Sequence, residues 1–157
     1  MAKIVIDSGF LIALFDSRDN YHQEAKIILA KLEDLKKKQL MRNLVVLWPV
    51  IYEVVNTKLV RNSTNFKRFL DFLNSFREVI EFTDDSKYRE EALNNIENGK
   101  RVSFTDHVIQ LFLSKKRGTG HYFITFNYRD FPQEYWFKNY GIRIVYSIQD
   151  FSWSSYV

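Results

Sequence analysis

The chain has 157 residues, 46% of them hydrophobic and 27% charged, a composition that suits one folded domain and excludes a mainly disordered chain. It contains no cysteine, which excludes disulfides, zinc ribbons, iron–sulfur clusters and thiol catalysis. The net charge of +4 is mild, so it permits a nucleic-acid partner without requiring one. No apolar run approaches the roughly 20 residues that span a bilayer, and no signal peptide precedes Asp7, so we expect a soluble, cytoplasmic protein with no membrane anchor.

Short apolar runs alternate with longer segments of helical periodicity along the chain. The expected elements, in chain order, are strand 3–6, helix 10–15, a helix from 19–20 to 38, strand 44–47, helix 49–59, helix 62–76, strand 79–82, a helix from 83–86 to about 98, helix 103–113, strand 122–125 and strand 142–145. Cap and turn residues mark several boundaries, among them Pro49, Asn62 and Gly99. The alternation predicts a three-layer α/β/α sandwich with a central parallel sheet, formed by a single domain over residues 1–157.

Acidic and amide residues fall where these strands end or where the helices beside them begin. Asp7 follows the first strand directly, and Asn127 and Asp130 follow the strand at 122–125. Asp106 opens the helix before that strand, and Glu53 lies in an otherwise apolar helix. Ligands of open α/β sheets bind beyond the carboxyl ends of the strands, so we expect these side chains to converge at one edge.

Clustered carboxylates repel one another, and a divalent cation removes that repulsion. Mg²⁺ and Mn²⁺ prefer hard oxygen ligands, and either ion can activate water for phosphodiester hydrolysis. Each residue also has a simpler interpretation, and these alternatives stay open. Asp7 can cap the helix that follows it, Asp106 can close a capping box with Ser103, Glu53 can be an exposed helix residue, and Asp130 can be a turn residue.

The stretch IVIDSGFLIALFDSRDNYHQEA resembles the opening of PIN-domain proteins, especially the VapC-like toxins of type II toxin–antitoxin pairs. That family opens with a strand, an aspartate, one or two small residues, an apolar helix, a second aspartate and a D-x-x-H-x-x-A signature. The matching residues here are Asp7, Ser8, Gly9, Asp16, Asp19, His22 and Ala25. Later family acids match Glu53 in VIYEVVN, Asp106 in an S-x-x-D context and the segment 125–131. The resemblance spans residues 3–145.

This resemblance implies a PIN-like, flavodoxin-like fold and a metal-dependent endoribonuclease that acts on RNA. It also implies a homodimer and a cognate antitoxin protein as partner. Asp7 and Asp106 would hold a Mg²⁺ or Mn²⁺ ion, with Glu53 as a ligand directly or through water. Asn127 and Asp130 would orient the attacking water or bind a second ion weakly. The chain departs from the family at Asn127, where an aspartate is usual, and Asp130, three residues later, is the candidate substitute.

Two other functions compete with this hypothesis. A PIN-fold module that binds RNA or protein without cutting is favoured by the amide at Asn127. A receiver-like phosphotransfer domain is disfavoured, because its acidic pair follows the first strand directly and here only Asp7 does. Basic clusters could track an RNA backbone or complement helix C-termini; they are Lys36–Lys38, Lys58 with Arg61, Lys67–Arg68, Lys100–Arg101, Lys115–Arg117 and Arg129. The aromatic residues Trp136, Phe137, Trp153 and Tyr156 could close the core, form a protein interface or, as a third alternative, stack on bases.

Overall fold

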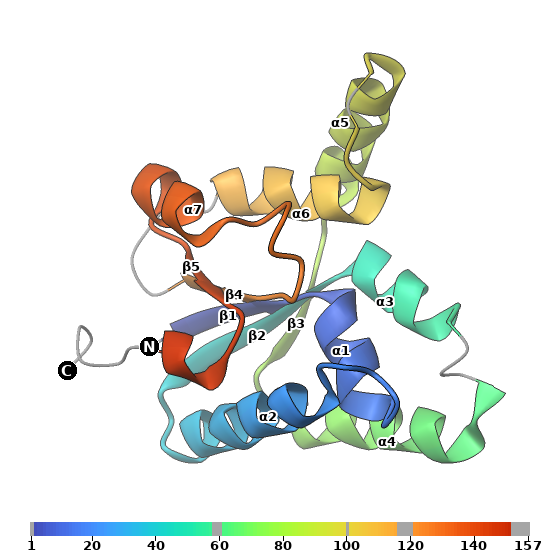
Figure 1. Ribbon diagram of the computed structural model, residues 1–157, viewed down its shortest axis with the longest axis vertical. Helices are drawn as coiled ribbons and strands as arrows, with labels where there is room; N and C mark the ends of the chain where they lie inside the picture. Colours follow the sequence, from blue (N-terminus) through green and yellow to red (C-terminus); the bar gives the residue numbers. More distant parts are fainter. Residues whose placement is uncertain (1, 58–60, 100, 116–120, 152–157) are drawn as a thin grey trace.

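The computed structural model describes residues 2–57, 61–99, 101–115 and 121–151, and its centre is a five-stranded parallel sheet (Figure 1). The strands are β1 (Ala2–Ile6), β2 (Met41–Leu47), β3 (Ile80–Thr83), β4 (His121–Ile124) and β5 (Arg143–Val145). The helices are α1 (Ser8–Phe15), α2 (His22–Lys37), α3 (Trp48–Val55), α4 (Ser63–Ser75), α5 (Ser86–Glu97), α6 (Phe104–Lys115), α7 (Gln133–Tyr140) and the short 3-10 helix η2 (Ile148–Asp150). The predicted α/β sandwich with a central parallel sheet is confirmed.

The helices cover the two faces of the sheet in two groups. In Figure 1, α1, α2 and α4 lie below the sheet, α6 and α7 lie above it, and α5 projects beyond α6. The strand order is β3-β2-β1-β4-β5, so the chain moves outward from β1 to β3 and then returns past β1 to β4. Parallel crossovers are right-handed, so the helices before and after this reversal are placed on opposite faces.

Coverage on both faces explains why the central strands read as continuous apolar runs rather than as alternating ones. Four of the five residues of β1 and three of the four residues of β4 are buried. The apolar stripes of α2 and α4 complete the core below the sheet with Ile28, Leu32, Phe69 and Phe72. The helix ends follow local cap chemistry; for example, the Asn62 side chain accepts hydrogen bonds from the first turn of α4.

The register of β1 and β4 brings the C-terminal ends of these two strands to the same level at the edge of the sheet. Ile6 of β1 pairs with Ile124 of β4, and the Asp7 N–H then donates to the Ile124 carbonyl oxygen at 3.1 Å. The next residues, Asp7 and Thr125, therefore stand side by side although 118 positions separate them in the chain. The strand order also reverses between β1 and β4, and the crevice outside such a reversal is the usual ligand site of an open α/β sheet.

A buried aspartate ties the ends of β2 and β3 together. Asp85, which is fully buried, accepts a hydrogen bond at 3.0 Å from the backbone N–H of Trp48, the first residue of α3. Its other carboxylate oxygen lies 2.8 Å from Arg89 Nε, one turn further along α5. Because Trp48 opens the helix that bears Glu53, this contact orients α3 relative to the sheet.

The structure differs from the sequence predictions mainly after β4. Helix α7 was not predicted, although Pro132 precedes it and Gly141, at φ +70°, ends it. Trp136 of α7 closes the core, whereas Phe137 beside it is exposed. The other two C-terminal aromatic residues, Trp153 and Tyr156, lie outside the described residues. None of the helices in the described ranges is both long and apolar enough to cross a membrane.

Candidate metal-binding and catalytic site

Asp7 lies at the centre of the carboxyl edge of the sheet and is 5% exposed. It is the N-cap of α1, where its Oδ1 accepts a hydrogen bond from the Ser8 N–H at 2.7 Å. Its Oδ2 accepts a hydrogen bond from the Thr125 hydroxyl, also at 2.7 Å. The helix-capping role of Asp7, which the sequence left as an alternative, is therefore confirmed. The same carboxylate also bonds Thr125, the residue that follows β4.

Glu53 reaches the site through Ser8. The Ser8 hydroxyl donates to Glu53 Oε2 and also lies 3.4 Å from Asp7 Oδ1, so one side chain links the two carboxylates. Glu53 itself is an exposed residue of α3, as its simpler interpretation expected. Together with Asn56 it lines a shallow cavity of about 230 Å³ between α3 and the start of α6. The open side of the site thus lies beside Glu53.

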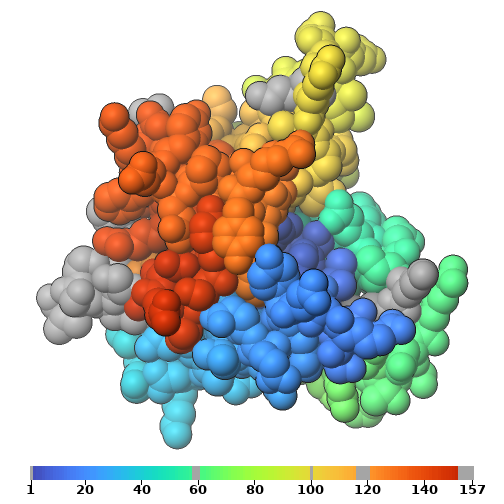
Figure 2. Space-filling view, viewed as in Figure 1, coloured from blue at the N-terminus to red at the C-terminus, as the bar shows by residue number. Residues whose placement is uncertain are grey.

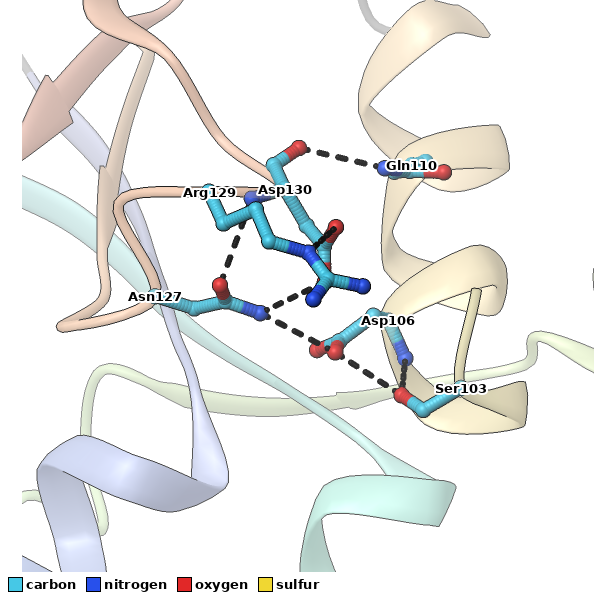
Figure 3. Close-up of polar contacts among 6 residues, drawn as sticks. All are labelled: Ser103, Asp106, Gln110, Asn127, Arg129 and Asp130. Atoms are coloured by element: carbon cyan, nitrogen blue, oxygen red, sulfur yellow. Dashed lines mark hydrogen bonds and ion pairs between the residues drawn. The ribbon is translucent and has the colours of Figure 1, made fainter. Parts of the chain in front are cut away.

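Asp106, Asn127 and Asp130 form the other half of the site (Figure 3). Asp106 Oδ2 accepts hydrogen bonds from the Ser103 hydroxyl at 2.8 Å and from Asn127 Nδ2 at 3.1 Å. The same Asn127 nitrogen donates to Asp130 Oδ2 at 3.0 Å, and Asn127 Oδ1 accepts from the Asp130 N–H at 3.2 Å. Asn127 therefore bridges two carboxylates that would otherwise repel each other.

The electrostatics show that the two halves belong to one site. Burial, with a smaller contribution from the nearby charges of Asp106 and Glu53, raises the pKa of Asp7 from its ordinary 3.8 to about 7, although hydrogen bonds from Thr125 and Ser8 lower it. Burial also raises the pKa of Asp106, with Asp130 and Glu53 adding to the effect and Ser103 and Asn127 opposing it. The structure thus brings all five predicted residues, Asp7, Glu53, Asp106, Asn127 and Asp130, to one edge.

The donor set has the chemistry that a hard divalent cation prefers. The charges of Asp106 and Glu53 raise the pKa of Asp7, the charge of Glu53 also raises that of Asp106, and a bound cation would relieve this repulsion. Within the described ranges, no three histidine, aspartate or glutamate side chains are already drawn together as a metal-binding group. Mg²⁺ commonly takes only one or two protein carboxylates and keeps several waters, so Asp7 and Asp106 fit it as a pair.

Two hydroxyl residues of the site were not predicted to act there. Ser8 joins Asp7 to Glu53, and Thr125 donates to Asp7 while accepting from the Asn127 N–H at 3.0 Å. Their position in the sequence could have indicated a role at the site, because Ser8 lies two residues after the end of β1 and Thr125 one residue after the end of β4. Spacing along the chain could not show which carboxylate each hydroxyl would meet.

The D-x-x-H signature of the opening segment lies outside the acidic cluster. Asp19 accepts from the Tyr21 N–H at 2.8 Å, and His22 Nδ1 donates to the Ala13 carbonyl oxygen at 2.8 Å. These bonds hold the turn between α1 and α2. The ring of Tyr21 in that turn stacks on the ring of Phe126, with 4.5 Å between their centroids. Figure 2 shows the blue segment around residue 20 against the orange segment that follows β4.

Basic residues near the site are few in the described part of the chain. Arg129 has a side chain 86% exposed, and its Nε lies 3.6 Å from Asp130 Oδ1. Arg101 is exposed just before Ser103, whereas Lys100 lies outside the described residues, as do Lys58, Lys116 and Arg117. His107 is buried and lies 2.8 Å from Asn95, so it packs between α5 and α6.

Comparisons with known proteins find similarity to solved structures. No family model matches the chain, and no curated protein matches it. Among solved structures, the chain is similar to the crystal structure of VapC20 from Mycobacterium tuberculosis, a toxin that cleaves the sarcin–ricin loop. The two share 20% identity over 72% of this chain and 82% of that one, with a TM-score of 0.49.

Proposed function

We propose that this chain is a metal-dependent endoribonuclease that hydrolyses RNA phosphodiester bonds at the carboxyl edge of its sheet. The observation that carries the proposal is the convergence of Asp7, Glu53 and Asp106 from three separate elements, where burial and the charges of the other two carboxylates together raise the pKa of Asp7 to about 7. Strongly perturbed pKa values of carboxylates cluster at functional sites. The sequence resemblance to PIN-domain proteins supports RNA as the substrate.

Each side chain of the site has a distinct role in this proposal. Asp7 and Asp106 would hold a Mg²⁺ or Mn²⁺ ion, with Glu53 contributing directly or through a water. When bound there, a divalent cation supplies Lewis-acid chemistry that favours ionisation of water and stabilises charge on phosphate oxygens. Asp130 would orient the attacking water or bind a second ion weakly. Asn127 holds Asp106 and Asp130 at hydrogen-bonding distance from one amide nitrogen, which makes it a positioning residue.

The direct test is cleavage of total cellular RNA by the purified chain with Mn²⁺, with EDTA, and in the variants Asp7→Asn and Asp106→Asn. We expect discrete fragments only when metal and both carboxylates are present. Asp84→Asn is the matched control, because Asp84 is an exposed acid at the end of β3 whose carboxylate bonds Ser86. Cleavage that survives either site substitution, or that needs no metal, would refute the proposal.

The sequence resemblance further supports a role as the toxin of a toxin–antitoxin pair, acting as a homodimer. An antitoxin that covers the acidic edge would block it, and its removal would free the nuclease. Light scattering of the purified chain tests the dimer. Growth arrest on expression that depends on Asp7, and that is relieved by co-expression of a partner protein, tests the toxin role.

The second candidate is a module that binds RNA or protein without cutting. Its support is Asn127, whose amide already bridges Asp106 and Asp130 by hydrogen bonds without a cation. Calorimetric titration with Mn²⁺ separates the two functions. A nuclease takes up the ion and loses that uptake in Asp7→Asn, whereas a folded chain without uptake favours the binding module.

A further inference from the structure

A cavity of about 460 Å³ opens beside the acidic site, on the side away from Glu53. It lies between α6 and α7 and is closed by the loop after β4, which also carries Asn127. Asp130 and Arg129 stand in its wall, so the cavity and the site share one residue. Its volume falls within the roughly 300–1,000 Å³ of pockets that bind small organic groups.

Aromatic rings form the α7 side of this cavity. Tyr135, Trp136 and Tyr140 line it, with Trp136 and Tyr140 centroids 5.0 Å apart. Tyr135 makes T-shaped contacts with both, at 5.8 Å and 6.2 Å, yet its side chain remains 52% exposed. Aromatic side chains that line an open cavity are the usual platform for stacking an unpaired base.

The polar part of the cavity carries little net charge. Gln110 donates from Nε2 to the Asp130 carbonyl oxygen at 3.2 Å, which fixes an amide in the wall. Among the lining residues that the structure describes, the charged side chains are Asp130 and Arg129, whose Oδ1 and Nε lie 3.6 Å apart. These described residues offer a phosphate group no surplus of positive charge, whereas they offer a neutral nucleobase aromatic rings and an amide. The exposed Arg129 guanidinium lies at the edge, where a flanking phosphate could meet it.

We propose that this cavity binds an unpaired nucleobase of single-stranded RNA next to the phosphodiester held at the acidic edge. The inference rests on the proposed ribonuclease function and adds a base-binding subsite to it. Base stacking on Tyr135 and Tyr140 would orient the strand, and Arg129 would contact the backbone beside Asp130. A base-paired strand could not insert a base, so the subsite would select single-stranded RNA.

Binding without cleavage tests the subsite, using labelled short single-stranded oligoribonucleotides of each base in EDTA. We expect Tyr135→Ala to weaken binding about tenfold, in line with loss of one stacked base, and Tyr135→Phe to bind as the unmodified protein does. Phe137→Ala is the matched control, because Phe137 lies on the same helix, is 53% exposed and does not line this cavity. Duplex RNA of the same sequences should bind equally to all variants.

Photo-crosslinking with thiouridine-substituted RNA locates the base independently. Crosslinks on the α7 peptide, lost in Tyr135→Ala, would support the subsite. If Tyr135→Ala and Phe137→Ala bind RNA alike while metal-dependent cleavage is intact, the subsite is refuted and the nuclease stands. If no variant binds or cleaves RNA under any condition, the proposed function fails and the subsite fails with it.

Discussion

Replacing Asp7 by Asn should stabilise the metal-free protein, although it removes a side chain proposed to be essential for activity. Asp7 is 5% exposed, and its pKa is raised to about 7 by burial and by the charges of Asp106 and Glu53. In the unfolded chain the same carboxyl ionises near 3.8. Between these two pH values the folded state holds a proton that the unfolded state has released, so the free energy of unfolding falls as pH rises.

The size of this effect follows from the same two values. A rise from 3.8 to about 7 corresponds to about 4 kcal/mol, at about 1.4 kcal/mol per pKa unit, and this cost is complete only above about pH 7. Asparagine keeps an acceptor for the Ser8 N–H, and its amide can donate to the Thr125 hydroxyl, which would cost about 1 kcal/mol in a poorer hydrogen bond. We therefore expect Asp7→Asn to be more stable by about 3 kcal/mol near pH 8 and nearly equal near pH 5.

Thermal and urea unfolding in EDTA at both pH values measures the difference. A gain of about 3 kcal/mol corresponds to a rise in Tm of roughly 6–12 °C for a domain of this size. The exposed Asp84 is the control, because its pKa is lowered by hydrogen bonds from Ser86 and its removal should bring no gain. Mn²⁺ should stabilise the unmodified protein and leave Asp7→Asn unchanged.

A result in the opposite direction would refute the electrostatic account. If Asp7→Asn were less stable than the unmodified protein by the same amount at both pH values, the hydrogen bonds of Asp7 would outweigh the cost of its burial. The acidic edge would then be a structural cap, and the main argument for a metal site would be lost.

Two further predictions concern the same edge of the sheet. Asn127→Asp should destabilise the metal-free protein, because it removes the donor between Asp106 and Asp130 and adds a charge, and calorimetry should show uptake of an additional Mn²⁺ ion; unchanged stability and uptake would contradict this bridging role. Asp85→Ala should lower the free energy of unfolding by roughly 3 kcal/mol, because it leaves Arg89 without its buried partner, and a loss no larger than that of Asp84→Ala would show that the pair contributes little.

Much of the fold could be predicted from local patterns of apolar and polar residues in the sequence. The strand at 3–6 and the apolar stripe between 62 and 76 are encoded in runs and periods only a few residues long, and the structure has both as expected. Helix α7 was missed because its eight residues carry aromatic side chains on several sides and show no clear apolar stripe. The signals that did mark its ends, Pro132 and Gly141, were too few to predict a helix alone.

The sequence itself determined that Asp7, Asn127 and Asp130 follow strands, that Asp106 lies in the first turn of a helix and that Glu53 lies within an apolar helix, since these positions depend on where each element begins and stops. Which of these side chains touch was decided only by the tertiary structure. The register of Ile6 with Ile124 sets Thr125 against Asp7, and the packing of α3 against α1 brings Glu53 to Ser8. Strand order and register arise from contacts between residues far apart in the chain, so they cannot be predicted from the pattern of neighbouring residues.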